Sequence, residues 1–437
     1  MFKIYDLETA RKTILKRVPL NQQPIPKGLQ RGVEEIFGPG ATPDQAVRQI
    51  LRSIQEEGDR ALKKWTRVLD HTDLDTFLVP PDELEKAYRE LDPALQEALD
   101  TAVRRIEDFH SRQPLPDWTT TEMGGMVGQR VTPVGSAGVY VPGGTAPLPS
   151  SLLMSVLPAR AAGVKRVVVA TPPQPAPVIL AAAYLCGVEE VYQVGGAQAV
   201  GALAFGTESI PKADKIVGAG NLFVTLAKQQ VFGVVGLDGL AGPTETMVIA
   251  DSTARPDWVA ADLLAQAEHD VLASAILITP DQQLAEAVQA AVAAQIENLS
   301  RAEIIAQSLE NQGGAVITPD LDTAAEVADK YAAEHLCLAV ENPLELSEKI
   351  NNAGGFFLGE YSFEVLGDYL AGPSHVMPTG GTARFASPLN VMDFVKISSL
   401  ISLDPDTGRK LSKAASLLAR EEKLTAHAAS ADFRRGT

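Results

Sequence analysis

The chain has 437 residues, 45% hydrophobic and 21% charged, a composition that excludes global disorder and suits more than one hydrophobic core. Its formal net charge of −17 argues against nucleic acid or an anionic membrane as the main partner, because both require a basic surface. Two cysteines, Cys186 and Cys337, are too few for a disulfide framework or a multi-thiolate metal site.

The N-terminal sequence MFKIYDLETARK lacks the apolar core of a signal peptide. No uninterrupted apolar run reaches the roughly 18 residues that suggest a membrane span. We therefore expect a soluble, cytoplasmic α/β protein.

The first 120 or so residues are predicted to be mostly helical. Thr42 is placed as an N-cap before Pro43, and apolar residues then recur at helical spacing. A second helical pattern begins at Pro93. The strand-like stretch GGMVGQRVTPVGSAGVYVPGG follows over 124–144 and ends in a glycine turn.

From residue 164 onward, short Val- and Ile-rich runs alternate with helical patterns in two successive arrays. The first starts with VKRVVVATPP and the second runs from ETMVIAD to GFFLGEY. This alternation is typical of parallel sheets built from βαβ units. The predicted fold class is therefore α/β, with two Rossmann-like parallel-sheet domains, a helical N-terminal segment and a small C-terminal helical element.

The predicted domain boundaries follow from these changes in pattern. We expect an N-terminal arm over 1–28, a first Rossmann-like domain from 29–138 and 246–382, a second over 139–245, and a C-terminal element over 383–437.

Four of the six histidines lie in polar or turn-adjacent contexts: His269, His335, His375 and His427. Gln266 and His269 are three residues apart on a predicted helix and would project from one face. Asp368 adds a carboxylate from a predicted Gly- and Pro-rich loop. This N/O donor set suits zinc or a similar divalent ion, although a simple Gln–His surface pair is the alternative.

Glu334 and His335 are adjacent where a predicted helix runs directly into a strand. Such a pair can divide acid–base work, because the reference pKa values of the two side chains differ by about two units. The alternative is a histidine cation that is favoured by the C-terminal dipole of the helix.

Three glycine turns, VGAGN, VGGAQA and YVPGG, can present backbone N–H groups to phosphate. They are compatible with dinucleotide binding but do not establish it, because Phe223 occupies the place of the third glycine in the GxGxxG fingerprint.

Taken together, these stretches closely resemble the histidinol dehydrogenase family over roughly residues 130 to 430. The resemblance rests on ordered motifs: YVPGG, GGAQA, ALAFGTES, LAGPTE, DLLAQAEHD, AAEHL, GDYLAGPSHVMPTGGTARF and LTAH. It implies zinc and NAD as cofactors, and oxidation of L-histidinol to L-histidine through the aldehyde with two NAD⁺, the last step of histidine biosynthesis. It also implies a homodimer in which the C-terminal segment completes the partner's site, and an NAD-binding role for the 139–245 domain.

The resemblance further implies specific residue roles. Metal ligands would be Gln266, His269, Asp368 and His427, and the catalytic pair would be Glu334 and His335. Thr244, His375 and Glu422 would contact the substrate together with the metal ligands and the catalytic pair. NAD contacts would be Tyr140, Gln198 and Asn221.

Three positions depart from the usual family pattern: Thr244 stands for a common Ser, Ala219 for Pro, and Ser374 for Asn. None removes a proposed ligand or base.

Three rival interpretations remain open from the sequence. The nearest is a related zinc- and NAD-dependent dehydrogenase of another small hydroxy compound; His375 and Glu422 favour a substrate with an imidazole and an amine. A thiol-dependent aldehyde dehydrogenase would need Cys186 or Cys337, yet both lie in apolar contexts typical of buried thiols. A metal-stabilised binding protein would not need the Glu334–His335 pair.

Overall fold

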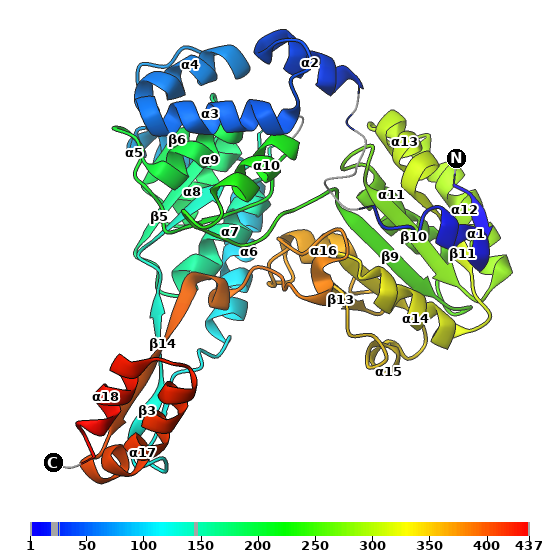
Figure 1. Cartoon of the computed structure of the whole chain (residues 1–437). Helices are drawn as coiled ribbons and strands as arrows, with labels where there is room; N and C mark the ends of the chain where they lie inside the picture. Colours follow the sequence, from blue (N-terminus) through cyan, green and yellow to red (C-terminus); the bar gives the residue numbers. More distant parts are fainter. Residues whose placement is uncertain (1, 19–24, 26, 144–146, 436–437) are drawn as a thin grey trace. The chain divides into compact units, whose positions relative to one another are not determined.

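The computed structural model describes residues 2–18, 25, 27–143 and 147–435, and its contacts divide the chain into two units (Figure 1). The first unit comprises Met1–Arg112 and Gly135–Asp393, and the second comprises Gln113–Val134 and Phe394–Thr437.

A five-stranded parallel sheet in the first unit has the strand order β6-β5-β4-β7-β8. Its strands are β4 (Ser136–Tyr140), β5 (Arg166–Thr171), β6 (Glu190–Gln193), β7 (Lys215–Val217) and β8 (Gly236–Leu237). The intervening helices are α7 (Pro149–Ala161), α8 (Pro177–Leu185), α9 (Gly196–Phe205) and α10 (Leu222–Val231). Strands β4 and β5 are almost wholly buried, as expected for a sheet covered on both faces.

The helices of the N-terminal region pack against this five-stranded sheet. They are α2 (Lys27–Phe37), α3 (Pro43–Glu57), α4 (Asp59–Leu69), α5 (Pro81–Arg89) and α6 (Pro93–Ser111). Helix α3 contacts α9 and α10, α5 contacts α8, and α6 contacts α7. Thr42 caps α3 with a capping box and Pro43 is the first helical residue, which confirms the predicted start.

A six-stranded parallel sheet has the order β1-β11-β10-β9-β12-β13. Its strands are β1 (Ile4–Asp6), β9 (Glu245–Ala250), β10 (Ser274–Thr279), β11 (Gly313–Ile317), β12 (His335–Ala339) and β13 (Gly355–Leu358). Its helices are α1 (Leu7–Lys12), α11 (Pro256–Ala267), α12 (Gln282–Ile296), α13 (Ala302–Gln312), α14 (Leu321–Tyr331), α15 (Pro343–Ser347) and α16 (Glu364–Tyr369). Two 3₁₀ turns, Thr382–Arg384 and Val391–Phe394, follow.

The second unit is an antiparallel sheet of order β14-β3-β2 with two helices. Its elements are β2 (Trp118–Thr120), β3 (Gly125–Pro133), β14 (Val395–Leu403), α17 (Pro405–Glu421) and α18 (Thr425–Asp432). Several of its large apolar side chains are exposed, among them Ile401, Leu418 and Phe433. The unit therefore has little core of its own.

The predicted fold class is confirmed: both large sheets are parallel and alternate with helices. The structure distributes the segments differently from the predicted boundaries. Residues 4–6 of the arm form an edge strand of the six-stranded sheet, and helices α3–α6 pack on the 139–245 sheet rather than on 246–382. The C-terminal unit recruits residues 113–134, because β3 is the long pairing partner of β14. Arm residues 1, 19–24 and 26, and the last two residues of the C-terminal element, lie outside the described residues.

In the described part of the chain, every helix is too short or too polar to cross a lipid bilayer.

Candidate active site

Glu334 and His335 lie at the start of strand β12, in the tight connection from α14. Helix α14 ends at Tyr331, and Ala332 turns the chain in the left-handed region at φ 54°. His335 is the first residue of β12 and pairs in register with Thr246 of β9. Both side chains are buried. The sequence correctly placed them between a helix and a strand.

The main chain of Glu245 holds both of these side chains. Its N–H donates to Glu334 Oε2 at 3.0 Å, where the Thr244 hydroxyl also donates at 2.6 Å. Its carbonyl oxygen lies 3.2 Å from His335 Nδ1, so the hydrogen of a neutral His335 belongs on Nδ1. His335 Nε2 is then left as the acceptor; it is buried and has no hydrogen-bond partner among the described residues, with Asp368 Oδ1 3.7 Å away.

Burial and neighbouring carboxylates shift the pKa values of both residues. Burial raises the pKa of Glu334 to about 7, against the lowering effects of His335 and Thr244. Burial alone would lower the pKa of His335, but the carboxylates of Glu364, Glu334 and Asp368 outweigh it and raise that pKa to about 10. A carboxyl group with a pKa near neutrality is suited to act as a general base at physiological pH.

The three predicted metal ligands of the first unit lie on neighbouring elements. Gln266 is fully buried in the last turn of α11, and Asp368 belongs to α16, which contacts α11. Asp368 had been predicted in a loop; it lies instead in a short helix. His269 lies two residues beyond the end of α11 rather than on its face, because the chain must turn there to enter β10 at Ser274.

Asp368 is the centre of a cluster of imidazoles. Burial would raise its pKa, but His335, His375 and His269 together hold the pKa of this carboxyl below its usual value. Of these three imidazoles, only His269 belongs to the predicted set of metal ligands. Among the described residues, however, His, Cys, Asp and Glu alone form no group of three or more that could hold an ion. The predicted ligand set is not a group of this type, because Gln266 contributes an amide and His427 lies in the second unit.

His375 lies beside Asp368 and bridges to the other half of the first unit. Its Nδ1 is 2.9 Å from the Asp368 carbonyl oxygen, and its Nε2 is 3.3 Å from Ser151 Oγ on α7. The preceding Ser374 is buried and donates to the Met154 carbonyl at 2.9 Å. Serine at this position therefore leaves no polar atom unsatisfied.

Glu364 is a buried carboxyl in this cluster that the sequence analysis missed. It lies in the first turn of α16 and accepts a hydrogen bond from the Thr246 hydroxyl. The Gln266 amide nitrogen donates to Glu364 Oε1 at 2.5 Å in one of the two possible amide orientations. In this orientation the Gln266 amide oxygen also accepts from Glu245 N. Burial raises the pKa of Glu364 to about 8. Its spacing of four residues from Asp368 on a helix was the one available signal, and the assignment of this segment to a loop concealed it.

The predicted cofactor residues lie at the carboxyl ends of strands in the five-stranded sheet. Tyr140 is the last residue of β4, and its hydroxyl accepts from Gly196 N at 3.1 Å. Gln198, in the first turn of α9, donates to Asp70 at 2.9 Å, while its buried Oε1 finds no partner among the described residues. Asn221 caps α10 with its side chain.

Close packing within the chain requires two glycines at this edge of the sheet. A Cβ on Gly195 would lie 3.0 Å from the Pro172 ring, and one on Gly218, at φ 107°, would lie 2.2 Å from the Tyr140 carbonyl oxygen. Only glycine allows such a close approach of the backbone. Gly144 of the YVPGG turn lies outside the described residues.

A family model, several relatives and one solved structure that covers nearly the whole chain point to the same family. The model of the family described as histidinol dehydrogenase matches residues 39–435. The chain belongs to the histidinol dehydrogenase family. The protein named histidinol dehydrogenase from Thermus thermophilus is 50% identical over 394 residues, covering 90% of this chain and 95% of that protein. A crystal structure of histidinol dehydrogenase from Elizabethkingia anophelis superposes with a TM-score of 0.90 at 34% identity, covering 99% and 98% of the two chains.

A relative from Moorella thermoacetica, also named histidinol dehydrogenase, is 51% identical over 395 residues and covers 89% of this chain and 93% of its own length. The family match begins at residue 39 and therefore includes helices α3–α6, a region outside the sequence motifs on which the resemblance rests. Members of this family are NAD-dependent oxidoreductases, so the chain is an oxidoreductase.

Two residues that the family resemblance implicates lie in the second unit. Glu422 is the C-cap of α17 and His427 lies in α18; both side chains are exposed. An exposed histidine and carboxylate are accessible to another site or subunit. Their contribution to the site stays a prediction.

The cysteines are unsuited to a thiol mechanism. Both are buried and free, and burial raises the pKa of each thiol well above its ordinary value. This agrees with the prediction that they are small apolar core residues.

Proposed function

We propose that the chain oxidises L-histidinol to L-histidine in two successive hydride transfers to NAD⁺, the last step of histidine biosynthesis, in the cytoplasm. Membership of the family and the buried Glu334–His335 pair carry this proposal. The exposed apolar residues of the second unit support a homodimer in which that unit, with Glu422 and His427, completes the partner's site.

The first step converts the alcohol to the aldehyde. His335 Nε2, whose other nitrogen is held by the Glu245 carbonyl, takes the hydroxyl proton while the carbon loses hydride to NAD⁺. The products of this step are L-histidinal, NADH and one proton.

The second step begins with water. Glu334, with a pKa near 7, removes a proton from a water molecule that attacks the aldehyde carbon. The resulting hydrate loses a second hydride to a second NAD⁺ and becomes the carboxylate, so that the step consumes L-histidinal, water and NAD⁺ and yields L-histidine, NADH and two protons. Thr244 and the Glu245 N–H orient Glu334 for this task.

Gln266, His269, Asp368 and His427 would hold zinc. The fit rests on the electrostatic interaction of His269 with Asp368 and on the N/O character of the donor set. When bound, zinc would orient the amine and imidazole of the substrate. Its positive charge near His335 would oppose the carboxylates of Glu364, Glu334 and Asp368, which raise the pKa of this imidazole, and would thus favour the neutral form that a base requires. His375 and Glu422 would recognise the imidazole and amine.

NAD would be held by Tyr140, Gln198 and Asn221. The position of Tyr140 and Asn221 beyond the carboxyl ends of strands, and a Gln198 Oε1 without a partner among the described residues, fit a polar ligand. When bound, NAD⁺ accepts the hydride.

The test is to incubate the purified protein with L-histidinol and NAD⁺ and to count NADH released per histidine formed. A ratio near two supports the complete oxidation. Accumulation of the aldehyde with one NADH, or no turnover while another small alcohol is oxidised, would contradict it.

A second test concerns the metal. Removal of bound metal with a chelator should stop turnover, and zinc should restore it. Full activity in protein that elemental analysis shows to be metal-free would exclude the zinc site.

A further inference from the structure

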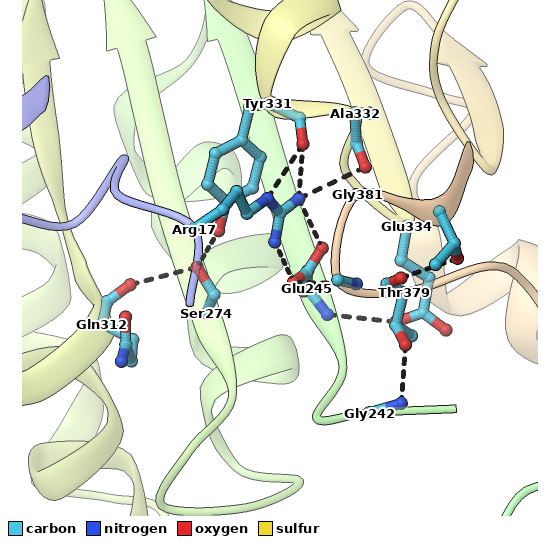
Figure 2. Close-up of polar contacts among 12 residues, drawn as sticks. Arg17, Gly242, Glu245, Ser274, Gln312, Tyr331, Ala332, Glu334, Thr379 and Gly381 are labelled. Atoms are coloured by element: carbon cyan, nitrogen blue, oxygen red, sulfur yellow. Dashed lines mark hydrogen bonds and ion pairs between the residues drawn. The ribbon is translucent and has the colours of Figure 1, made fainter. Parts of the chain in front are cut away.

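Arg17 belongs to the N-terminal segment, defined here as residues 2–18, and its side chain lies beside the candidate active site. Its guanidinium donates to the Tyr331 carbonyl at 3.0 Å from Nε and to the Ala332 carbonyl at 3.2 Å from Nη2. Its Cζ lies 3.5 Å from the centre of the Tyr331 ring (Figure 2). Arg17 therefore satisfies the carbonyl groups that the end of α14 leaves free and also stacks on an aromatic face.

The same guanidinium forms a two-pronged ion pair with Glu245. Nη2 lies 2.9 Å from Glu245 Oε2, and Nη1 contacts Oε1 (Figure 2). The Glu245 side chain is 9% exposed, and its Oε1 also accepts from Gly380 N at 3.2 Å. Such a charge-assisted, bidentate contact fixes the orientation of both partners.

These contacts connect Arg17 to both catalytic candidates without touching either one. Glu245, which Arg17 holds by the side chain, binds Glu334 through its N–H and His335 through its carbonyl oxygen. Ala332, which Arg17 holds by the carbonyl, lies two residues before Glu334 in the turn into β12. One side chain thus ties together the starts of the two strands from which the acid–base pair projects.

We propose that Arg17 and Glu245 are positioning residues for the reaction. The pair fixes the first peptide groups of β9, and these keep the hydrogen of neutral His335 on Nδ1 and direct the Glu334 carboxylate. Nε2 is thereby presented as the acceptor. This inference rests on the proposed roles of Glu334 and His335.

The alternative is that Arg17 merely anchors the N-terminal segment. The segment offers a matched control, because Lys3 forms another ion pair from it, with Glu310 at 2.7 Å. Both side chains of that pair are about half exposed, and the pair lies at the β1 end of the sheet. Lys3→Met therefore weakens the same segment without disturbing β9 or β12.

The experiment compares Arg17→Ala with Lys3→Met in the full-length protein. We expect Arg17→Ala to lower kcat by about 100-fold, with KM for both substrates changed by less than about threefold and metal content unchanged, because misplacement of catalytic groups affects the transition state most. Lys3→Met should retain kcat. Equal kcat in Arg17→Ala and wild type, or equal losses in both variants, would overturn the proposal.

Two further measurements separate positioning from folding. Millimolar guanidinium should restore part of the kcat of Arg17→Ala but not affect Lys3→Met, and the absence of any rescue would count against the pair. If Arg17→Ala does not fold, Arg17→Lys is the informative variant. We expect its kcat to fall about tenfold at an unchanged thermal midpoint, because an ammonium cannot reproduce the two-pronged contact; wild-type kcat in Arg17→Lys would overturn the proposal.

A double variant tests the coupling within the pair. Because Glu245→Gln removes the charge that Arg17 compensates, Arg17→Ala combined with Glu245→Gln should lose no more kcat than Arg17→Ala alone. Losses that multiply would show that the two residues act independently. His335→Ala, measured in parallel, separates failure of the proposed catalytic pair from failure of the positioning role. If His335→Ala retains activity, the catalytic pair is wrong. If His335→Ala loses activity and the Arg17 variants retain it, only the positioning role is wrong.

Discussion

The two parallel sheets of the first unit place their candidate functional residues at opposite ends of their strands. In the five-stranded sheet, Tyr140 ends β4 and Asn221 follows β7, as is usual for ligand sites in open α/β sheets. In the six-stranded sheet, Glu245 begins β9 and His335 begins β12. The cofactor candidates thus lie at the carboxyl ends of the strands of their sheet, where ligands usually bind. The acid–base candidates lie at the amino ends of the strands of the other sheet.

The chemistry at the two edges also differs. The carboxyl-terminal edge of the five-stranded sheet carries glycines, the Gln198 amide and the Tyr140 phenol, which bind a ligand through shape and hydrogen bonds. The six-stranded edge buries Glu334, His335 and Glu364 side by side, and burial or mutual attraction shifts the pKa of each. Groups with such shifts cluster at reactive sites, so we expect substitutions at this edge to affect the chemical step and those at the other edge to affect cofactor binding.

The largest expected effect is at the six-stranded edge. His335→Ala should lower the rate of NADH formation from histidinol by about 1,000-fold or more, because it removes the group that accepts the hydroxyl proton. Steady-state kinetics and elemental analysis of the same sample check this. Parallel loss of activity and metal would indicate a structural role instead.

The pH dependence of the second oxidation should follow Glu334. This carboxyl acts as a base only when it is ionised, and burial raises its pKa to about 7. With histidinal as substrate, kcat should therefore be constant above pH 8 and fall about tenfold per pH unit well below 7. A profile that is flat down to pH 5 would exclude Glu334 as the base.

At the five-stranded edge, Gln198→Ala should raise KM for NAD⁺ by about tenfold and leave KM for histidinol nearly unchanged, because it removes a buried amide from the proposed cofactor contacts. Varying each substrate in turn measures both constants. An effect confined to histidinol would reverse the assignment of the two edges.

The smallest effect is expected from the cysteines. The double variant Cys186→Ala, Cys337→Ala should keep kcat within about threefold of wild type, since neither buried thiol is activated. Some loss of thermal stability, about 1 kcal/mol per site, is expected from the small cavities. Abolished turnover in a folded sample would support a thiol mechanism.

Local sequence patterns predicted most of the fold but only part of the site. The Val- and Ile-rich strands and the cap at Thr42 depend on neighbouring residues, so they were predicted correctly. Helix α16 was missed because it has only six residues, includes Gly367 and leads directly into a Gly- and Pro-rich segment; the buried contacts of Glu364 with Thr246 and Gln266 stabilise it. Helix α13 was also not predicted.

Arg17 could not have been found from sequence. Its partners Glu245 and Tyr331 lie 228 and 314 residues away, so no local spacing reveals the contact. The adjacency of Glu334 and His335 was visible, but their support by the Glu245 main chain was not. The strand-end rule alone would have placed the acid–base pair at the wrong edge of its sheet.

The most direct test of the account is the activity of Glu334→Gln with histidinal and NAD⁺, compared with its first oxidation of histidinol in a single turnover. If Glu334 activates water at the start of β12, oxidation of histidinal should fall by at least about 100-fold while the first hydride transfer is largely retained. Histidinal oxidation at the wild-type rate in metal-replete Glu334→Gln would contradict the assignment of the acid–base pair to this edge of the sheet.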